Sequence, residues 1–124
     1  MTISIINLLF ILLNHWYADF VCQTDWQAKN KSSSNKALLQ HTVVYSLVMF
    51  ATCAVLGVFS AASTSQVCLW VGLNFALHTM TDYVTSRISK KFHAQGKIHE
   101  FFVVVGFDQF IHYACLILTF VWLF

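Results

Sequence analysis

Three histidine–aspartate pairs with the same spacing stand out in this sequence. In each pair the two residues are four positions apart within an apolar stretch. The pairs are His15 with Asp19, His78 with Asp82, and Asp108 with His112. A spacing of four places both side chains on one face of an α-helix. Imidazole and carboxylate groups are ligands of zinc and related divalent metals, so the pattern predicts a metal site held between helices.

The elements that must position these pairs are membrane spans. Hydrophobic residues make up 58% of the 124 residues and charged residues 10%, whereas about a quarter of a soluble globular domain is charged. Four apolar stretches reach the roughly 20 residues that a helix needs to cross a bilayer. They cover residues 3–22, 37–60, 66–86 and 101–124. We therefore predict an all-α fold, a polytopic four-helix transmembrane bundle that forms one domain over residues 1–124.

The basic residues predict how this bundle is oriented. All 7 Lys and Arg residues fall in the first and third linkers between the predicted spans. In a four-span protein these two linkers lie on the same side, and the positive-inside rule places them in the cytoplasm. Both termini are then expected outside the cytoplasm, in a multi-pass protein of the bacterial inner (plasma) membrane.

The order of residues within the pairs matches this orientation. Spans one and three run inward and place His before Asp, whereas span four runs outward and places Asp before His. At 1.5 Å per residue, the Asp residues lie roughly 10–12 Å and the His residues roughly 16–18 Å from the cytoplasmic helix ends. His41 lies near the cytoplasmic start of span two. All four spans can thus direct His or Asp into one chamber in the inner half of the membrane.

Four His and three Asp make seven candidate ligands, which is more than one zinc takes. Zinc has three or four protein ligands, and a catalytic zinc keeps one position open. Seven ligands suit two divalent ions, with zinc the expected metal and a carboxylate bridging them. The alternative is a set of buried ion pairs and hydrogen bonds that fix helix register. Clustered carboxylates repel one another unless a cation or protons neutralise them, which favours metal.

Other polar residues are candidates for supporting roles. Gln23 and Asn74 extend the polar faces of the pairs, and they either orient a ligand or form interhelical hydrogen bonds. Gln109 is a further candidate to orient a ligand, although it is expected to point about 100° away from its neighbour Asp108 on the helix. Arg87, Lys90 and Lys91 in the third linker either enforce topology or bind a substrate phosphate at the mouth of the chamber.

The run from His15 to Trp26 resembles the opening of a family of short bacterial and phage membrane proteins of unknown function. That opening reads H-x-x-a-D-F-x-x-Q-x-x-W, and the later H-x-x-x-D and D-Q-x-x-H motifs extend the resemblance over nearly the whole chain. More distantly, the pattern is similar to the YdjM-type membrane-bound metal-dependent hydrolases. Beyond these it is similar to the helical superfamily of zinc-dependent phospholipase C and single-strand nucleases. That distant resemblance implies phosphoesterase chemistry.

We therefore expect metal-dependent hydrolysis of a phosphate ester on a lipid or lipid-linked substrate, from the cytoplasmic side. Metal-bound water would be the nucleophile, and no separate catalytic base is assigned. One alternative is a non-catalytic, metal-stapled protein that binds another membrane protein, as a phage accessory factor would. Another is a metal or proton carrier, since His and Asp chains also build relays; oligomerisation would give such a carrier more room. No nucleic-acid partner is expected, because the basic residues are few and sit in short linkers.

Overall fold

The computed structural model describes residues 4–58 and 62–124, and the elements in these ranges are all helical. This confirms the all-α prediction. The elements are α1 (Ile5–Trp16), the π-helical turn η1 (Tyr17–Val21), α2 (Asp25–Asn30), α3 (Asn35–Val55), α5 (Thr64–Ala94) and α6 (Ile98–Leu123).

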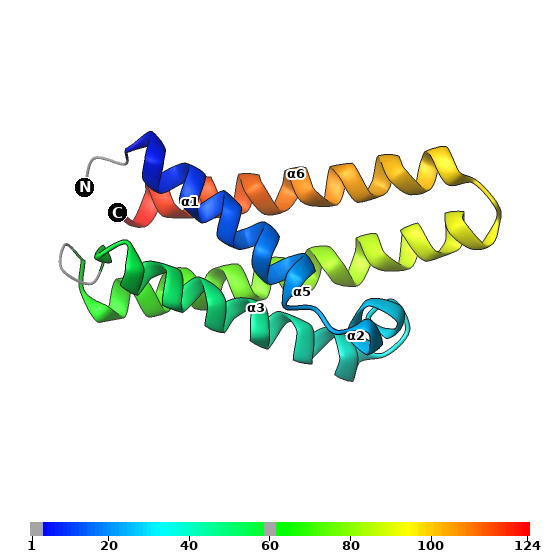
Figure 1. Ribbon diagram of the computed structural model, residues 1–124, viewed down its shortest axis with the longest axis horizontal. Helices are drawn as coiled ribbons and strands as arrows, with labels where there is room; N and C mark the ends of the chain where they lie inside the picture. The colour runs from blue at the N-terminus through cyan, green and yellow to red at the C-terminus, as the bar shows by residue number, and fades with distance from the viewer. Residues whose placement is uncertain (1–3, 59–61) are drawn as a thin grey trace.

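The long helices α5 and α6 form an antiparallel hairpin, and the other elements pack against it (Figure 1). Helix α3 lies along α5, whereas α1 crosses obliquely and contacts both α3 and α6. The short helix α2 contacts α3. The start of α1 and the end of α6 lie at the same end of the bundle, opposite the turn between α5 and α6. Each long helix therefore passes the middle of the molecule, where one chamber can receive side chains from all of them.

The helices begin where the sequence offers side-chain caps. Thr24 and Ser63 form capping boxes with Gln27 and Gln66, and Ser34 accepts a hydrogen bond from a backbone N–H in the first turn of α3. Each such cap satisfies an N–H that the helix leaves without an internal partner. The starts of α2, α3 and α5 are thus fixed locally, whereas α6 begins after Lys97 without a side-chain cap.

Helix α5 corrects the predicted third span. We expected that span to end near residue 86 and to be followed by a linker carrying Arg87, Lys90 and Lys91. The helix instead continues to Ala94, so all three residues are helical. The chain contains no proline, and the first residue that favours a stop is Gly96, whose φ of 70° is the left-handed conformation typical after a helix.

The predicted spans one and two differ from the helices at their ends. Residue 3 and residues 59–60, which belong to those predictions, lie outside the described residues. Within them, α3 ends at Val55, and the first span is an α-helix only as far as Trp16. Its last turn, Tyr17–Val21, is π-helical. A π-helical turn accommodates one extra residue and is frequent at functional sites, and this one contains Asp19.

Within the described residues, two helices are long and apolar enough to cross a membrane, namely Asn35–Val55 and Ile98–Leu123. The segment Ile5–Val21 is apolar but shorter. Helix α5 is long enough, but Asn74, His78 and Asp82 interrupt its apolar sequence. The predicted four-span arrangement is therefore not confirmed by length and composition alone.

The interior has an apolar part, which includes Met49, Trp70 and Phe120, and a polar part in the middle of the bundle. Seven of the buried residues carry an imidazole, a carboxylate or an amide in the middle of the bundle: His15, Asp19, His41, Asn74, His78, Asp82 and His112. Large apolar side chains are exposed along the outside, among them Leu9 on α1, Leu47 on α3 and Phe110 on α6. Contiguous apolar surface of this kind marks contact with a membrane or another protein.

Candidate metal centre

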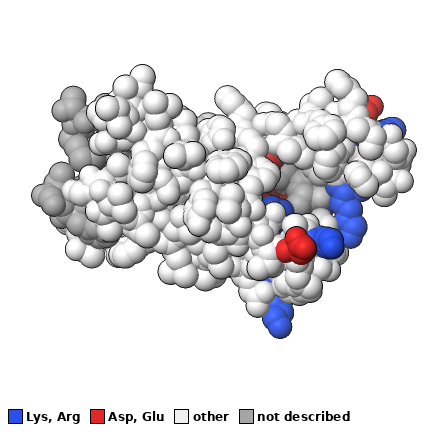
Figure 2. Space-filling view, in the orientation of Figure 1, with Lys and Arg blue, Asp and Glu red and all other residues white. Residues whose placement is uncertain are grey.

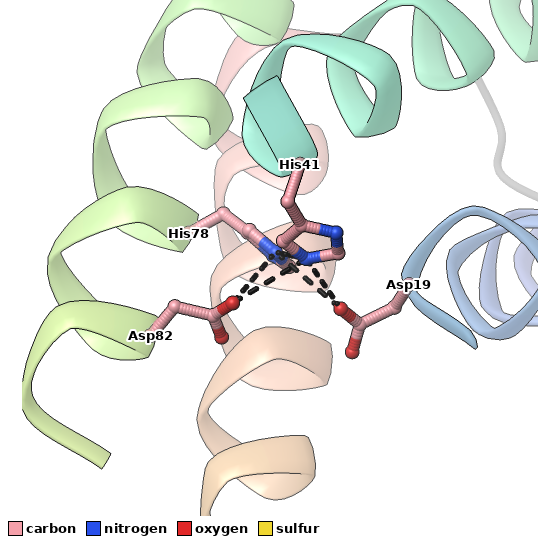
Figure 3. Close-up of side chains that lie close together, drawn as sticks. All are labelled: Asp19, His41, His78 and Asp82. Carbon is pink, nitrogen blue, oxygen red and sulfur yellow. Dashed lines mark hydrogen bonds and ion pairs between the residues drawn. The ribbon is translucent and has the colours of Figure 1, made fainter. Parts of the chain in front are cut away.

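Four side chains from three separate elements meet at the centre of the bundle. Asp19 comes from η1, His41 from α3, and His78 and Asp82 from α5, and all four are buried. Figure 3 shows their ligating atoms directed toward one another. One ligand atom from each lies within 4.8 Å of the others, so this first group can hold a metal ion.

The spacing of the four atoms matches the edges of a tetrahedron. His41 Nε2 lies 3.0 Å from Asp19 Oδ1, 3.4 Å from Asp82 Oδ2 and 3.2 Å from His78 Nε2. His78 Nε2 lies 3.5 Å from the same Asp19 oxygen and 3.6 Å from the same Asp82 oxygen. In a tetrahedral zinc site with ligands at 2.0–2.1 Å, neighbouring donors are about 3.3–3.4 Å apart. Five of the six edges are therefore within a few tenths of an ångström of zinc geometry.

The two buried aspartates each present their second oxygen to another set of ligands. Asp82 Oδ1 lies 3.1 Å from His112 Nε2, which is also 3.4 Å from Asp108 Oδ2. Asp19 Oδ2 lies on the same side, and Asp19, Asp108 and His112 form a second group that can hold a metal ion. Asp19 thus contributes to both groups, and Asp82 contacts the imidazoles of both. This is the arrangement expected of bridging carboxylates.

Gln109 connects the second group to His15. Its amide nitrogen donates to Asp19 Oδ2 at 2.9 Å and to Asp108 Oδ2 at 3.1 Å, and its carbonyl oxygen lies 3.1 Å from His15 Nε2. The other nitrogen of His15 shares a hydrogen bond of 3.1 Å with the Tyr45 hydroxyl. Both ring nitrogens of His15 are therefore engaged, and the structure places this predicted ligand beside the second group, 3.8 Å from Asp19 Oδ2.

Ring stacking, and not a hydrogen bond at Nδ1, orients the imidazole of His78. Its Nδ1 atom is buried without a hydrogen-bond partner among the described residues. The imidazole lies between Tyr45 and His112, with ring centroids 3.9 and 4.1 Å away and nearly parallel planes. The two flat contacts fix the ring plane, so that Nε2 is aimed at the first group.

Lys31 is a member of the site that sequence reasoning missed. It lies just after α2, and its ammonium donates to Asp82 Oδ2 at 3.0 Å. Burial disfavours the charge of this ammonium, but Asp82 and Asp19 outweigh that effect and raise the pKa of Lys31 above its ordinary value. Lys31 is one of three lysines in the first linker of the sequence. Its position relative to the His–Asp pairs did not distinguish it from Lys29 and Lys36.

A cavity of about 660 Å³ leads from the surface to these carboxylates. Asp19, Asp82, Asp108 and Gln109 line it, and so does Lys31. Figure 2 shows a hollow with acidic and basic atoms at its base, on the half of the molecule where the charged side chains of this face gather. The carboxylates of both groups therefore border the cavity, and Asp108 belongs to the second group alone, whereas the imidazoles of His41, His78 and His112 are not part of the lining.

The remaining predicted residues divide between the cavity and other contacts. Gln23 and Lys90 line the cavity. Asn74 donates to the Trp70 carbonyl and to Thr119, one turn away from the ligands. Arg87 lies over the Tyr83 ring and donates to Asn35, and Lys91 is exposed on α5. The structure thus places Lys90 at the mouth of the cavity and directs Arg87 toward α3.

Comparisons with known proteins give a family but no activity. A family model described as "Protein of unknown function (DUF3307)" matches residues 7–124. No curated protein and no solved structure matches the chain. The match fits the expected family of unknown function, and nothing in these comparisons supports the more distant resemblance to known hydrolases.

The first group predicts metal binding that depends on His78 and not on its polar neighbour Asn74. We expect the detergent-purified chain to retain divalent metal. His78→Ala should lower the metal content, because it removes one of the four ligands of the first group. Asn74→Ala is the matched control, because Asn74 is one turn away on the same helix and bonds to Thr119. Elemental analysis of the folded proteins measures the content. Equal metal in His78→Ala and Asn74→Ala would contradict the assignment.

Proposed function

Because the chain belongs to this DUF3307 family, whose function is unknown, its activity must be inferred from the site, and we propose a membrane-embedded, metal-dependent phosphohydrolase. The observation that carries the proposal is the pair of ligand groups at the base of an open cavity, which share Asp19 and are also connected by the contact of Asp82 with His112. Paired metal sites of this kind stabilise the attacking and the leaving oxygen of a displacement at phosphorus.

A four-span arrangement in the membrane is supported by where the polar and apolar side chains lie. All seven Lys and Arg residues are in or next to the two connections at one end of the bundle, after η1 and between α5 and α6. The polar residues of α5 that lower its hydropathy face the interior, while Met80 and Val84 between them are exposed. Lipid would thus meet an apolar surface on α5 as well as on α3 and α6.

Two ions are supported by the number of donors and by their division into two groups. The first ion would be held by Asp19, His41, His78 and Asp82, and the second by Asp108 and His112 with the outer oxygens of the two shared aspartates. Imidazole and carboxylate donors suit zinc. A divalent ion held in this way supplies a water nucleophile near neutral pH and polarises a phosphate oxygen.

The roles of the two groups follow from their access to the cavity. Four protein ligands close the first group, as in a structural zinc site. The second group borders the cavity through Asp108 and the Asp19 and Asp82 carboxylates, so a substrate can reach it. Gln109 holds Asp19 and Asp108 in place through its amide N–H groups, while their other oxygens contact His41 and the Thr85 hydroxyl.

The cavity walls favour a substrate with a phosphate and an apolar part. Lys31 and Lys90 supply positive charge, whereas Phe101 and Phe102 of α6 supply apolar surface. A phosphate ester on a lipid or lipid-linked molecule combines these two features. The proposed side of action is the cytoplasmic face of the inner membrane, where the basic connections are expected.

The first ligand group by itself also supports a non-catalytic alternative. Four buried protein ligands are what a structural ion requires, and the exposed apolar helices offer surface for another membrane protein. In that case the ion would staple η1, α3 and α5 together, and the cavity would be unused. The experiment on Asp108 described below separates the two functions.

The proposed orientation predicts the location of two reporters. A reporter fused after Phe124 should be active outside the cytoplasm, and one inserted near Ser33 should be active inside it, because the basic residues flank Ser33 and avoid the C-terminus. Paired alkaline phosphatase and fluorescent protein fusions measure both positions. The opposite pattern would place the cavity on the outer side, and two cytoplasmic reporters would contradict four spans.

The catalytic assignment predicts that Asp108 is needed for turnover. Metal-loaded protein in micelles should hydrolyse a member of a panel of phospholipids and polyprenyl phosphates, and lose the activity on chelation. Asp108→Asn should lower kcat by about 100-fold or more while the closed first group keeps its ion. Asp25→Asn, an exposed aspartate outside the cavity, is the matched control. A fully metallated protein that turns over no member of the panel would leave the stapled binding protein as the function.

A further inference from the structure

We infer that Lys31 is the residue that binds the phosphate group of the substrate. This inference rests on the proposed function, and it replaces Arg87, Lys90 and Lys91 as the basic residues expected to do so. Its ligand class is a phosphate ester whose anionic oxygens enter the cavity beside the Asp82 carboxylate, which contacts both ligand groups.

The position of Lys31 is the first argument. Its ammonium lies at the inner end of the cavity, 3.0 Å from Asp82 Oδ2, and 19% of its side chain is accessible. An ammonium has three N–H donors, and the structure assigns one of them, to Asp82. Two donors are therefore left for a group that enters from the cavity.

The other basic residues are less suited to this role. Arg87 is held by the Tyr83 ring, the Tyr83 carbonyl and Asn35, and these contacts turn it toward α3. Lys90 and Lys91 are exposed, at two turns or more beyond Asp82 along α5. Among the described basic residues, Lys31 alone has a hydrogen bond to a ligand of the proposed ions.

Two polar atoms that lack a partner provide an independent observation. Gln23 Oε1 and Ser86 Oγ are buried without a hydrogen-bond partner among the described residues, and both residues line the same cavity. A buried polar atom without a partner costs free energy. The Ser86 hydroxyl can donate to a phosphate oxygen, whereas Gln23 Oε1 only accepts, so it would need a donor such as a hydroxyl of the substrate or a water molecule. Ser86 follows Asp82 by one helical turn, so its hydroxyl lies on the face of α5 that leads from the cavity mouth to the carboxylates.

The charges of the site define how the phosphate would be held. The carboxylates of Asp82 and Asp108 repel an anion unless cations lie between them, and the proposed ions and the Lys31 ammonium supply these. A phosphate oxygen that accepts a hydrogen bond from Lys31 would be bound to the same ammonium as Asp82. The phosphate would therefore lie close to the ligands that Asp82 contacts. Lys31 would thus fix the phosphate beside the metals, and Ser86 would donate to a second oxygen.

Inorganic phosphate is the probe that tests this assignment. Calorimetric titration of the zinc-loaded full chain in dodecyl maltoside micelles should show binding that Lys31→Met weakens by about tenfold or more, the value of one charged hydrogen bond. Lys31→Arg should restore most of it. Lys29→Met is the matched control, because it removes an equal charge from the same cavity wall, and it should change the affinity by less than about threefold.

Ser86→Ala gives a second variant if Lys31→Met does not fold. Its hydroxyl has no partner to lose, so the variant should keep its thermal stability and bind phosphate more weakly. Equal phosphate affinity in Lys31→Met and Lys29→Met would overturn the inference. If Lys31→Met fails to fold, an unchanged affinity in Ser86→Ala would overturn it as well.

The metal content of each sample shows whether the role of Lys31 or the proposed function has failed. Zinc bound with no phosphate affinity in the wild type would overturn the inference and leave the metal centre standing. If the wild type retains no metal, the metal-dependent function fails, and the Lys31→Met and Lys29→Met affinities still decide the role of Lys31. Phosphatidic acid mixed into the same micelles distinguishes the source of the phosphate, because a lipid substrate should bind more tightly than inorganic phosphate through the apolar wall of α6.

Discussion

The structure depends on neutralising carboxylates that are buried in the middle of an apolar bundle. Asp19 and Asp82 are almost fully buried, and Asp108 is connected to Asp19 through Gln109 and to Asp82 through His112. Anionic groups in such surroundings are unfavourable unless a cation or hydrogen-bond donors compensate them. Several elements contribute to that compensation. Asp19 of η1 contacts His41 of α3, and Asp82 contacts His78 on the same helix, α5. Helix α6 supplies His112, and the turn after α2 supplies Lys31. A pair of divalent ions would complete it.

This requirement explains an architecture with a polar part in the middle of its interior and an apolar surface. A protein in water gains stability by burying apolar side chains. The apolar side chains on the outside of this bundle would not contribute that gain in water. Within a bilayer, exposed Leu, Val and Phe side chains are in their preferred surroundings, and polar groups hold the helices together instead. The centre would then have two functions at once, because the ions that support chemistry would also join elements distant in the chain.

Sequence reasoning predicted the residues that meet but not all the ways in which they meet. A four-residue spacing is a local property of a helix, so the three His–Asp pairs and their convergence were visible in the sequence. The π-helical turn at Asp19 was not, because it depends on how η1 packs against α3. Gln109 was expected to point away from Asp108, yet its long side chain reaches Asp19, Asp108 and His15. Lys31 was indistinguishable from its neighbours, since the turn after α2 selects it. The length of α5 was underestimated because basic residues were taken to mark a linker, although nothing before Gly96 ends the helix.

The central claim is that Asp19 and Asp82 join two metal ions, and anomalous diffraction at the zinc edge from crystals of the zinc-loaded chain tests it most directly. The account predicts two peaks about 3.5–4 Å apart. One should lie between His41 and His78, and the other beside Asp108 and His112, with an aspartate carboxylate between them. A single peak, or zinc bound only at surface histidines such as His93 and His99, would contradict it.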